Sequence, residues 1–225
     1  VRGCNTRVDL NNLEQIARRK MCEELMLHGV KIQDPATTYL YHDTKIAAGV
    51  IVEPNVFFGK NVTVEPGVHI KAFCHFEDAH IGENVTIGPF ARLRPGAKIG
   101  KNARIGNYIE VKNSNIGEGS KVNHFGYVGD CDMGQNVNFS CGAITVNYDG
   151  FDKHRTVIGD NVMVGSNVNL VAPVVIGDGA FIAAGSTMTK DVPADALSMT
   201  RPETNTREGW AAKFKKMKMR SKKNK

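Results

Sequence analysis

A hydrophobic residue recurs every six residues along most of this chain, and this repeat constrains the fold more than any other feature. A period of six differs from the period of a helix and from the alternation of a plain strand. It is typical of a parallel β-helix, in which six residues form one short strand and the corner after it. Three such sides close one coil of about 18 residues, with one aliphatic side chain per side pointing inward, so the repeat predicts about seven coils. The repeat positions are Val50, Val56, Val62, Val68, Ile81, Ile87, Leu93, Ile99, Ile105, Val111, Ile116, Val122, Val128, Met133, Phe139, Thr145, Ile158, Val164, Leu170, Ile176, Ile182 and Met188.

Two gaps of 13 residues interrupt the repeat. One runs from Thr145 to Ile158 and contains the sequence NYDG at residues 147–150. The other runs from Val68 to Ile81 and contains three histidines. Because loops that leave a rigid scaffold often carry function, we predict an extruded functional loop at each gap.

The net charge of +6 is concentrated at the C-terminus, where residues 211–225 contain eight Lys or Arg and no acidic residue. This tail has few aromatic residues for stacking on bases, so we expect no nucleic-acid partner. No apolar run reaches the roughly 18 residues of a membrane-spanning helix, and the start at Val1 lacks the apolar core of a signal peptide. The five scattered cysteines favour a reducing cytoplasm over a disulfide framework or a zinc site.

A helix is predicted before the repeat. Between Leu10 and Leu27 the apolar residues are three or four positions apart. Asn11 and Glu14 can form a capping box, and Gly29 can end the helix. We assign residues 9–34 to this linker helix, 45–192 to the repeat domain and 193–225 to a C-terminal arm with a basic tail.

Three motifs lie within the repeat: residues 88–96 (GPFARLRPG), residues 123–130 (NHFGYVGD) and the segment from Asn138 to Gly150. Together they resemble the acetyltransferase half of the bacterial bifunctional N-acetylglucosamine-1-phosphate uridyltransferase/glucosamine-1-phosphate acetyltransferase family, from residue 1 to about residue 210. The resemblance implies left-handed coils and a homotrimer with active sites between subunits. It also implies transfer of acetyl from acetyl-CoA to the amine of glucosamine 1-phosphate, while a separate N-terminal domain transfers UMP from UTP.

His124 is the candidate general base. The acceptor amine is an ammonium near neutral pH, and only the free amine can attack a thioester. An imidazole, with an unperturbed pKa of about 6.5, suits removal of that proton. A lone His on a repeat is more often structural, but within residues 123–130 the resemblance favours catalysis.

Arg94 and Lys112 resemble the family's sugar-phosphate ligands, and their spacing supports this role independently. They are 18 residues apart, and each follows an inward aliphatic residue. One full coil therefore places them on the same corner, about 5 Å apart. Two cations this close repel each other unless an anion bridges them, and a phosphate would do so. The alternative is that Glu110 or solvent neutralises them. Tyr127 and Asn138 resemble positions that hydrogen-bond the sugar.

The resemblance also implies a binding site for acetyl-CoA. Asn147 and Tyr148 match a pair that contacts the acetyl end. Ser166 and Ala184 are small enough to let the pantetheine arm lie against the coil, although corner packing explains small residues equally well. Arg201 resembles an arginine that binds a CoA phosphate.

This chain departs from the family pattern in three respects. Cys141 replaces an expected Ala at a position that contacts acetyl-CoA through its main chain, and Gly126 replaces an expected Ser or Thr. Residues 1–8 resemble only the last strand of the nucleotidyltransferase domain, which favours a fragment of a longer protein. Asn5 matches a Mg²⁺ ligand of that domain. Without the partner carboxylate we expect neither useful Mg²⁺ binding nor uridyl transfer.

Three other functions are compatible with a hexapeptide solenoid. The first is a different acyl-CoA N-acyltransferase, which would share the CoA site but not the phosphate clamp. The second is a carbonic-anhydrase-like metal site at His75 and His80, which needs a third ligand such as His69 or His42. The third is a non-catalytic scaffold.

Overall fold

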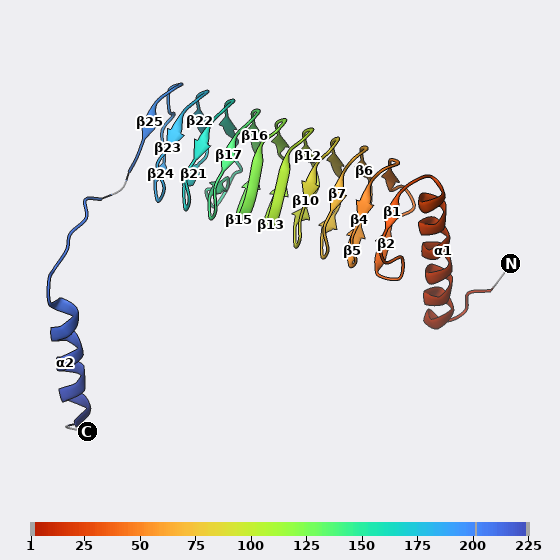
Figure 1. The fold of residues 1–225 in the computed structure, drawn as a ribbon, viewed down its shortest axis with the longest axis horizontal. Coiled ribbons are helices and arrows are strands. Elements are labelled where there is room, and N and C mark those ends of the chain that lie inside the picture. Colours follow the sequence, from red (N-terminus) through yellow and green to blue (C-terminus); the bar gives the residue numbers. More distant parts are fainter. Residues whose placement is uncertain (1–2, 201, 224–225) are drawn as a thin grey trace.

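The computed structural model describes residues 3–200 and 202–223. The helix α1 (Arg7–Leu27) stands at one end of a long solenoid of short parallel strands. Beyond the solenoid, an extended segment leads to the helix α2 (Trp210–Lys223), which lies away from the coils (Figure 1). The parallel β-helix that the repeat predicts is therefore confirmed.

Parallel pairing between successive coils builds three faces. The first face consists of β1 (Lys31–Ile32), β4 (Ile51–Val52), β7 (His69–Ile70), β10 (Thr86–Ile87), the first halves of β13 (Arg104–Lys112) and β15 (Lys121–Gly129), β17 (Asn138–Phe139), β20 (Met163–Val164), β23 (Phe181–Ile182) and β25 (Leu197–Ser198). The second face consists of β2 (Thr38–Leu40), β5 (Val56–Phe58), β8 (His75–Phe76), β11 (Arg92–Leu93), the second halves of β13 and β15, β18 (Ile144–Val146), β21 (Asn169–Val171) and β24 (Thr187–Met188). The third face consists of β3 (Lys45–Ile46), β6 (Val62–Val64), β9 (Ala79–Ile81), β12 (Ala97–Ile99), β14 (Asn115–Ile116), β16 (Cys131–Met133), β19 (Thr156–Ile158) and β22 (Val174–Ile176). We call the edge between the first and second faces the first corner, and the edge between the second and third faces the second corner.

The described residues form about nine coils, so the prediction of about seven was too low. The additional coils lie at the two ends, where the repeat is hidden in the sequence. In β2 the inward position is the fully buried Thr38, and after β22 a single bridge joins Ile176 to Val192. The coils therefore extend beyond residues 45–192 at both ends, from β1 to β25.

Most sides of a coil bury two side chains, one at or just before the start of the strand and one two residues later, not the one that the repeat predicts. In β5, Val56 and Phe58 are fully buried, while Phe57 between them is 40% exposed. The valines from Val50 to Val68 occupy the first inward position of each strand, and the series that begins at Ile81 occupies the second. The segment between them contains β7, β8 and β9 in register with adjacent coils. The extruded loop predicted between Val68 and Ile81 is therefore wrong.

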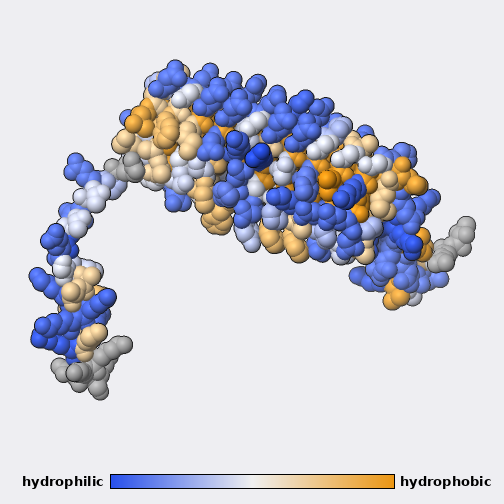
Figure 2. Space-filling view, in the orientation of Figure 1, coloured by the Kyte–Doolittle hydropathy of each residue, from blue (hydrophilic) through white to orange (hydrophobic). Residues whose placement is uncertain are grey.

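The helix α1 starts earlier than predicted. Its N-cap is Thr6, whose hydroxyl accepts from the main-chain N–H of Asp9 at 3.1 Å, while Asp9 accepts from the Thr6 N–H at 2.9 Å. This capping box replaces the one expected from Asn11 and Glu14. At the other end, the C-cap His28 precedes Gly29, which has a φ of +92°. Within the described part of the chain, no helix is long and apolar enough to cross a membrane. In the space-filling view, α2 is largely hydrophilic (Figure 2).

Candidate active site

His124 lies exposed on the first corner, where β15 bends from one face to the next. It is in register with Asn107 of the preceding coil. Its Nδ1 atom lies 3.3 Å from Oδ1 of Asn107, while Nε2 has no hydrogen-bond partner among the described residues. An Asn oxygen can only accept, so this contact requires the proton on Nδ1 and leaves Nε2 as the free base.

A shallow hollow of about 410 Å³ opens beside His124 along the first face. Its lining includes Lys71, Arg104, Asn107 and Asn123. The hollow therefore combines the candidate base with cationic and amide groups.

Three of the predicted acetyl-CoA residues follow His124 along the first corner, one coil after another. The N–H of Gly142 donates to the carbonyl of Phe125 at 2.8 Å, which places Cys141 next to His124. The N–H of Asn167 donates to Cys141 at 2.9 Å, and that of Gly185 donates to Ser166 at 2.8 Å. Cys141, Ser166 and Ala184 thus form one ladder with His124.

The small size of these ladder residues has a structural cause. At Gly165 a Cβ atom would lie 2.5 Å from the main-chain nitrogen of Ala184. The adjacent coil approaches so closely at this point of the first corner that residue 165 has no room for a side chain. This packing accounts for small residues at the corner and also leaves an uncluttered edge against which an extended ligand can lie.

Arg94 and Lys112 lie one coil apart on the second corner, because Leu93 pairs with Val111. Each has a carboxylate partner. Arg94 Nη1 is 2.8 Å from Glu110 Oε1, and Lys112 Nζ is 3.3 Å from Oδ2 of Asp130. The argument that two stacked cations need a bridging phosphate is therefore wrong, since protein carboxylates already neutralise both.

The second face separates the two groups of predicted ligands. From His124 to Gly129, β15 crosses this face in five residues, a distance of about 16 Å. Tyr127 lies between the two corners, and a Cβ atom at Gly129 would collide with its hydroxyl. The phenol therefore points toward the second corner. One chain does not bring His124 together with Arg94 and Lys112.

Asn138 lies on the first face, on the same side as the hollow beside His124. Its Nδ2 donates to Ser140 Oγ at 3.0 Å and lies 3.0 Å from Met163 Sδ. Asn138 is in register with Lys121 of the preceding coil.

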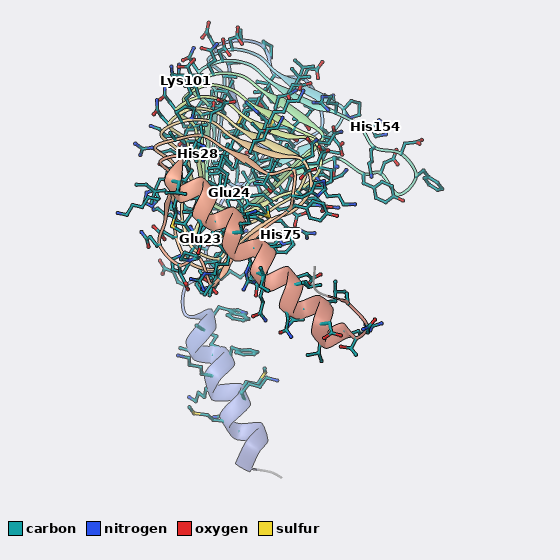
Figure 3. The ribbon with its side chains drawn as sticks, turned by 90° about the vertical axis from the view of Figure 1, so that its right-hand side faces the viewer. Glu23, Glu24, His28, His75, Lys101 and His154 are labelled. Atoms are coloured by element: carbon teal, nitrogen blue, oxygen red, sulfur yellow. The ribbon has the colours of Figure 1, made fainter. Side chains whose placement is uncertain are left out.

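The gap between Thr145 and Ile158 is an extruded loop, as predicted. Residues 147–155 leave the second corner between β18 and β19, and Figure 3 shows His154 in the part that projects from the solenoid. Tyr148 is 55% exposed and forms an antiparallel bridge with Lys153. Asn147 is 9% exposed, and its Nδ2 donates to Asp130.

Two carboxylates brace this loop. Asp149 accepts from the main-chain N–H groups of Asp152 at 2.7 Å and Phe151 at 2.8 Å, and from His154 Nε2 at 2.8 Å. The hydrogen bond from the Asp152 main chain, with those from His154 and Phe151, holds the pKa of Asp149 well below its usual range. At the far end of the loop, the guanidinium of Arg155 bonds Asp132 through two nitrogens.

The other predicted residues are Arg201, Asn5 and the histidine pair His75 and His80. Arg201 lies outside the described residues. Asn5 is exposed ahead of α1, where its main-chain N–H donates to Asp9 at 3.2 Å. His75 lies on the second face and His80 on the third, so the metal site proposed for this pair is wrong. Across residues 3–200 and 202–223, no three His, Cys, Asp or Glu side chains cluster as metal ligands.

Sequence reasoning missed the two residues that organise these sites, Asn107 and Asp130. Asp130 is the last residue of the motif at residues 123–130, but its position in that motif does not reveal its partners. Asn107 lies 17 residues before His124, one coil away, and the spacing alone could have identified it as the neighbour of the candidate base.

Comparison with known families supports the repeat assignment. Residues 78–108 and 155–190 match the model described as "Bacterial transferase hexapeptide (six repeats)". Residues 47–75 match "Hexapeptide repeat of succinyl-transferase". Among solved structures, UDP-N-acetylglucosamine acyltransferase of Francisella novicida has a TM-score of 0.65 and 22% identity, covering 74% of this chain and 65% of that one. LpxA from Acinetobacter baumannii also has a TM-score of 0.65 and 22% identity, covering 76% of this chain and 71% of that one. These likenesses show the fold alone.

Curated relatives are much more similar in sequence. The "Bifunctional protein GlmU" of Zymomonas mobilis subsp. mobilis is 49% identical over 97% of this chain and 48% of its own length. That of Agrobacterium fabrum is 48% identical over 93% of this chain and 46% of its own length. The chain spans about half the length of the curated relatives it matches. It is therefore a hexapeptide-repeat protein and a homologue of one half of the bifunctional GlmU proteins.

Proposed function

We propose that this chain transfers acetyl from acetyl-CoA to the amine of glucosamine 1-phosphate. The observation that carries the proposal is His124, an exposed imidazole with its Nδ1 held by Asn107 and its Nε2 free, within a chain 49% identical to a bifunctional GlmU. The product, N-acetylglucosamine 1-phosphate, would serve the synthesis of UDP-N-acetylglucosamine.

Nε2 of His124 accepts a proton from the acceptor's ammonium group, and the free amine attacks the thioester carbonyl. A C–N bond forms, the carbonyl oxygen gains charge, and main-chain N–H groups of the corner stabilise it. When the C–S bond breaks, the imidazolium returns its proton to the CoA thiolate, and the nitrogen releases its second proton to solvent to form the neutral amide. Acetyl has then moved to nitrogen, and His124 is again neutral.

The sugar phosphate is held by Arg94 and Lys112, which exchange part of their contact with carboxylates for the phosphate oxygens. Arg94 is partly exposed beside Glu110, and Lys112 is less exposed beside Asp130. Tyr127 and Asn138 hydrogen-bond the sugar hydroxyls. Phosphate recognition at the second corner distinguishes this function from that of other hexapeptide N-acyltransferases.

The acyl donor lies along the ladder that begins at His124. Its acetyl end meets the main chain of Cys141, and its pantetheine arm passes Ser166 and Ala184. The loop residues Asn147 and Tyr148, which lie at the second corner, reach the acetyl end from a neighbouring copy. Arg201 pairs with a CoA phosphate. The order of Cys141, Ser166 and Ala184 along the first corner fits one extended ligand.

A homotrimer completes the site. The clamp at the second corner and His124 at the first corner are about 16 Å apart across one face, further than a sugar phosphate reaches. A second copy whose second corner faces His124 removes this gap. The rings of Phe73, Phe90 and Tyr108 support such a contact, because they stack along the first corner at centroid distances of 5.0 Å and 5.1 Å and are at least 42% exposed. Such a row of exposed aromatic rings is typical of an interface.

The full-length parent would also transfer UMP from UTP, and we place residues 1–8 at the end of that domain. Asn5 would contribute one ligand to its Mg²⁺, which would balance the charge of the triphosphate. No cluster of three metal-ligating side chains occurs in the described part of the chain. The free thiols of Cys22, Cys74 and Cys131, all buried, favour the cytoplasm.

A thiol-release assay with acetyl-CoA tests the proposal. We expect CoA release with glucosamine 1-phosphate and at least tenfold less, at equal concentration, with unphosphorylated glucosamine, because the latter lacks the group that the second corner binds. Equal rates would favour another N-acyltransferase of this fold. No release with either amine would contradict the proposal.

A further inference from the structure

Asp130 is a buried carboxylate that takes no part in the chemical steps proposed above. It lies at the second corner between β15 and β16 and is 6% exposed. Its main-chain N–H donates to Lys112 at 3.0 Å, and its carbonyl accepts from Thr156 at 3.0 Å. Neighbouring coils on both sides therefore fix its position.

One oxygen of this carboxylate joins residues of two predicted ligand sites. Lys112 Nζ lies 3.3 Å from Oδ2, and Asn147 Nδ2 donates to the same atom. Asn113 Nδ2 donates to Oδ1 at 2.5 Å. Burial alone would raise the pKa of Asp130, but the hydrogen bonds from Asn113, Asn147 and Lys112 lower it below its ordinary value. Asp130 is therefore an anion at neutral pH.

We propose that Asp130 is a positioning residue that couples the binding of the sugar phosphate to the binding of the acyl donor. The inference rests on the proposed function, in which Lys112 contacts the phosphate and Asn147 contacts the donor. A phosphate at Lys112 shares the ammonium with Oδ2, which leaves that oxygen a stronger acceptor for Asn147. The first residue of the loop is then held more firmly, so each ligand strengthens the binding of the other.

Two neighbouring carboxylates provide matched controls, because each touches only one of the two sites. Glu110 accepts from Arg94 at 2.8 Å and has no contact with residues 147–155 among the described contacts. Asp132 accepts from Arg155 Nη2 at 2.6 Å, at the far end of the loop, and touches neither Arg94 nor Lys112 in the described structure. Removal of either charge should weaken the binding of one ligand and leave the coupling between the two ligands intact.

Calorimetric titration of this chain tests the coupling without turnover, with a thioether analogue of acetyl-CoA that keeps the acetyl carbonyl but cannot transfer it as the donor-site probe. In the wild type, saturating glucosamine 1-phosphate should tighten binding of the analogue about fivefold, and the saturating analogue should tighten glucosamine 1-phosphate binding by the same factor. Asp130→Asn should reduce this factor to about one, whereas Glu110→Gln and Asp132→Asn should retain it. Circular dichroism confirms that each variant is folded.

If Asp130→Asn does not fold, Asn147→Ala breaks the same link from the loop side and should also abolish the factor. An unchanged factor in Asp130→Asn or in Asn147→Ala would overturn the inference. So would a wild type that binds and acetylates glucosamine 1-phosphate without coupling, and the proposed function would then stand. A wild type with no acetyl transfer would overturn the proposed function and the inference with it.

Discussion

The contact between His124 and Asn107 determines which imidazole nitrogen is available for chemistry. Oδ1 of Asn107 accepts the proton on Nδ1, at an N···O distance of 3.3 Å. The remaining nitrogen, Nε2, then faces solvent as a base at the first corner. Asn107 acts through the imidazole, so it is a positioning residue.

We predict that Asn107→Ala lowers kcat about tenfold and leaves KM for both substrates nearly unchanged. The variant loses the contact that orients the imidazole of His124, but it keeps the residues that bind the two substrates. Asn107→Asp should retain most of the activity, since it keeps an acceptor oxygen at the same place. Steady-state kinetics on purified variants measure this split. A wild-type kcat for Asn107→Ala, or a rise in KM alone, would refute the positioning role.

The sequence indicates the positions of the proposed substrate ligands more readily than the positions of the residues that would orient them. Arg94 and Lys112 follow aliphatic repeat positions, so their alignment one coil apart is visible in the sequence. Asp130 and Asn147 are 17 residues apart, which is one coil, but Asn147 is the first residue of the extruded loop, and polar residues are common at corners. Nothing in their identities indicates that they share a hydrogen bond.

At the scale of strands, the sequence predicts the period but not which inward position a residue occupies. Valine suits both the first and the second inward position of a strand, so a valine in the sequence does not show which of the two it occupies. After Val68 the apolar repeat residues change from the first inward position to the second. In the sequence, this change therefore looks like an extra residue in the repeat. The polar core position Thr38 conceals the first coil in the same way. At the gap after Thr145 no such change occurs, and the extra residues leave the coil as a loop.

The assignment of residues 68–81 to a regular coil can be tested with two phenylalanines in that segment. Phe76 is fully buried and packs edge-on against Phe58 at 5.6 Å, whereas Phe73 is 53% exposed. We predict that Phe76→Ala lowers the free energy of unfolding by about 3–5 kcal/mol. The matched control Phe73→Ala, which loses one exposed ring stack, should lower it by about 1 kcal/mol or less. Equal losses in urea denaturation would favour an extruded loop.

At the scale of the whole molecule, the proposed function and the distance between the two corners together imply that each active site needs two chains. The same face carries His124 at one edge and the phosphate clamp at the other. In a closed ring of three copies, each subunit can therefore contribute His124 to the site that it shares with one neighbour and the phosphate clamp to the site that it shares with the other.

Mixed assemblies test this arrangement. Chains carrying His124→Ala and chains carrying Arg94→Ala should each be inactive alone. When they are co-expressed in equal amounts, about a quarter of the interfaces should combine an intact base with an intact clamp and recover about a quarter of the wild-type rate. Recovery of activity requires assemblies that contain both variants. Mixing the two variants after each has assembled alone, under conditions in which subunits no longer exchange, should therefore give no activity. If each chain contained a complete site, co-expression would restore nothing.

The most direct test of the account is the effect of His124→Ala on acetyl transfer to glucosamine 1-phosphate. If His124 is the general base, kcat should fall by a factor of about 10²–10⁴ in this variant. The affinity for CoA and the thermal unfolding temperature should stay close to those of the wild type. Thiol release, CoA titration and a thermal melt on the same preparation measure all three. A His124→Ala variant that keeps the wild-type kcat would show that this histidine is not the general base.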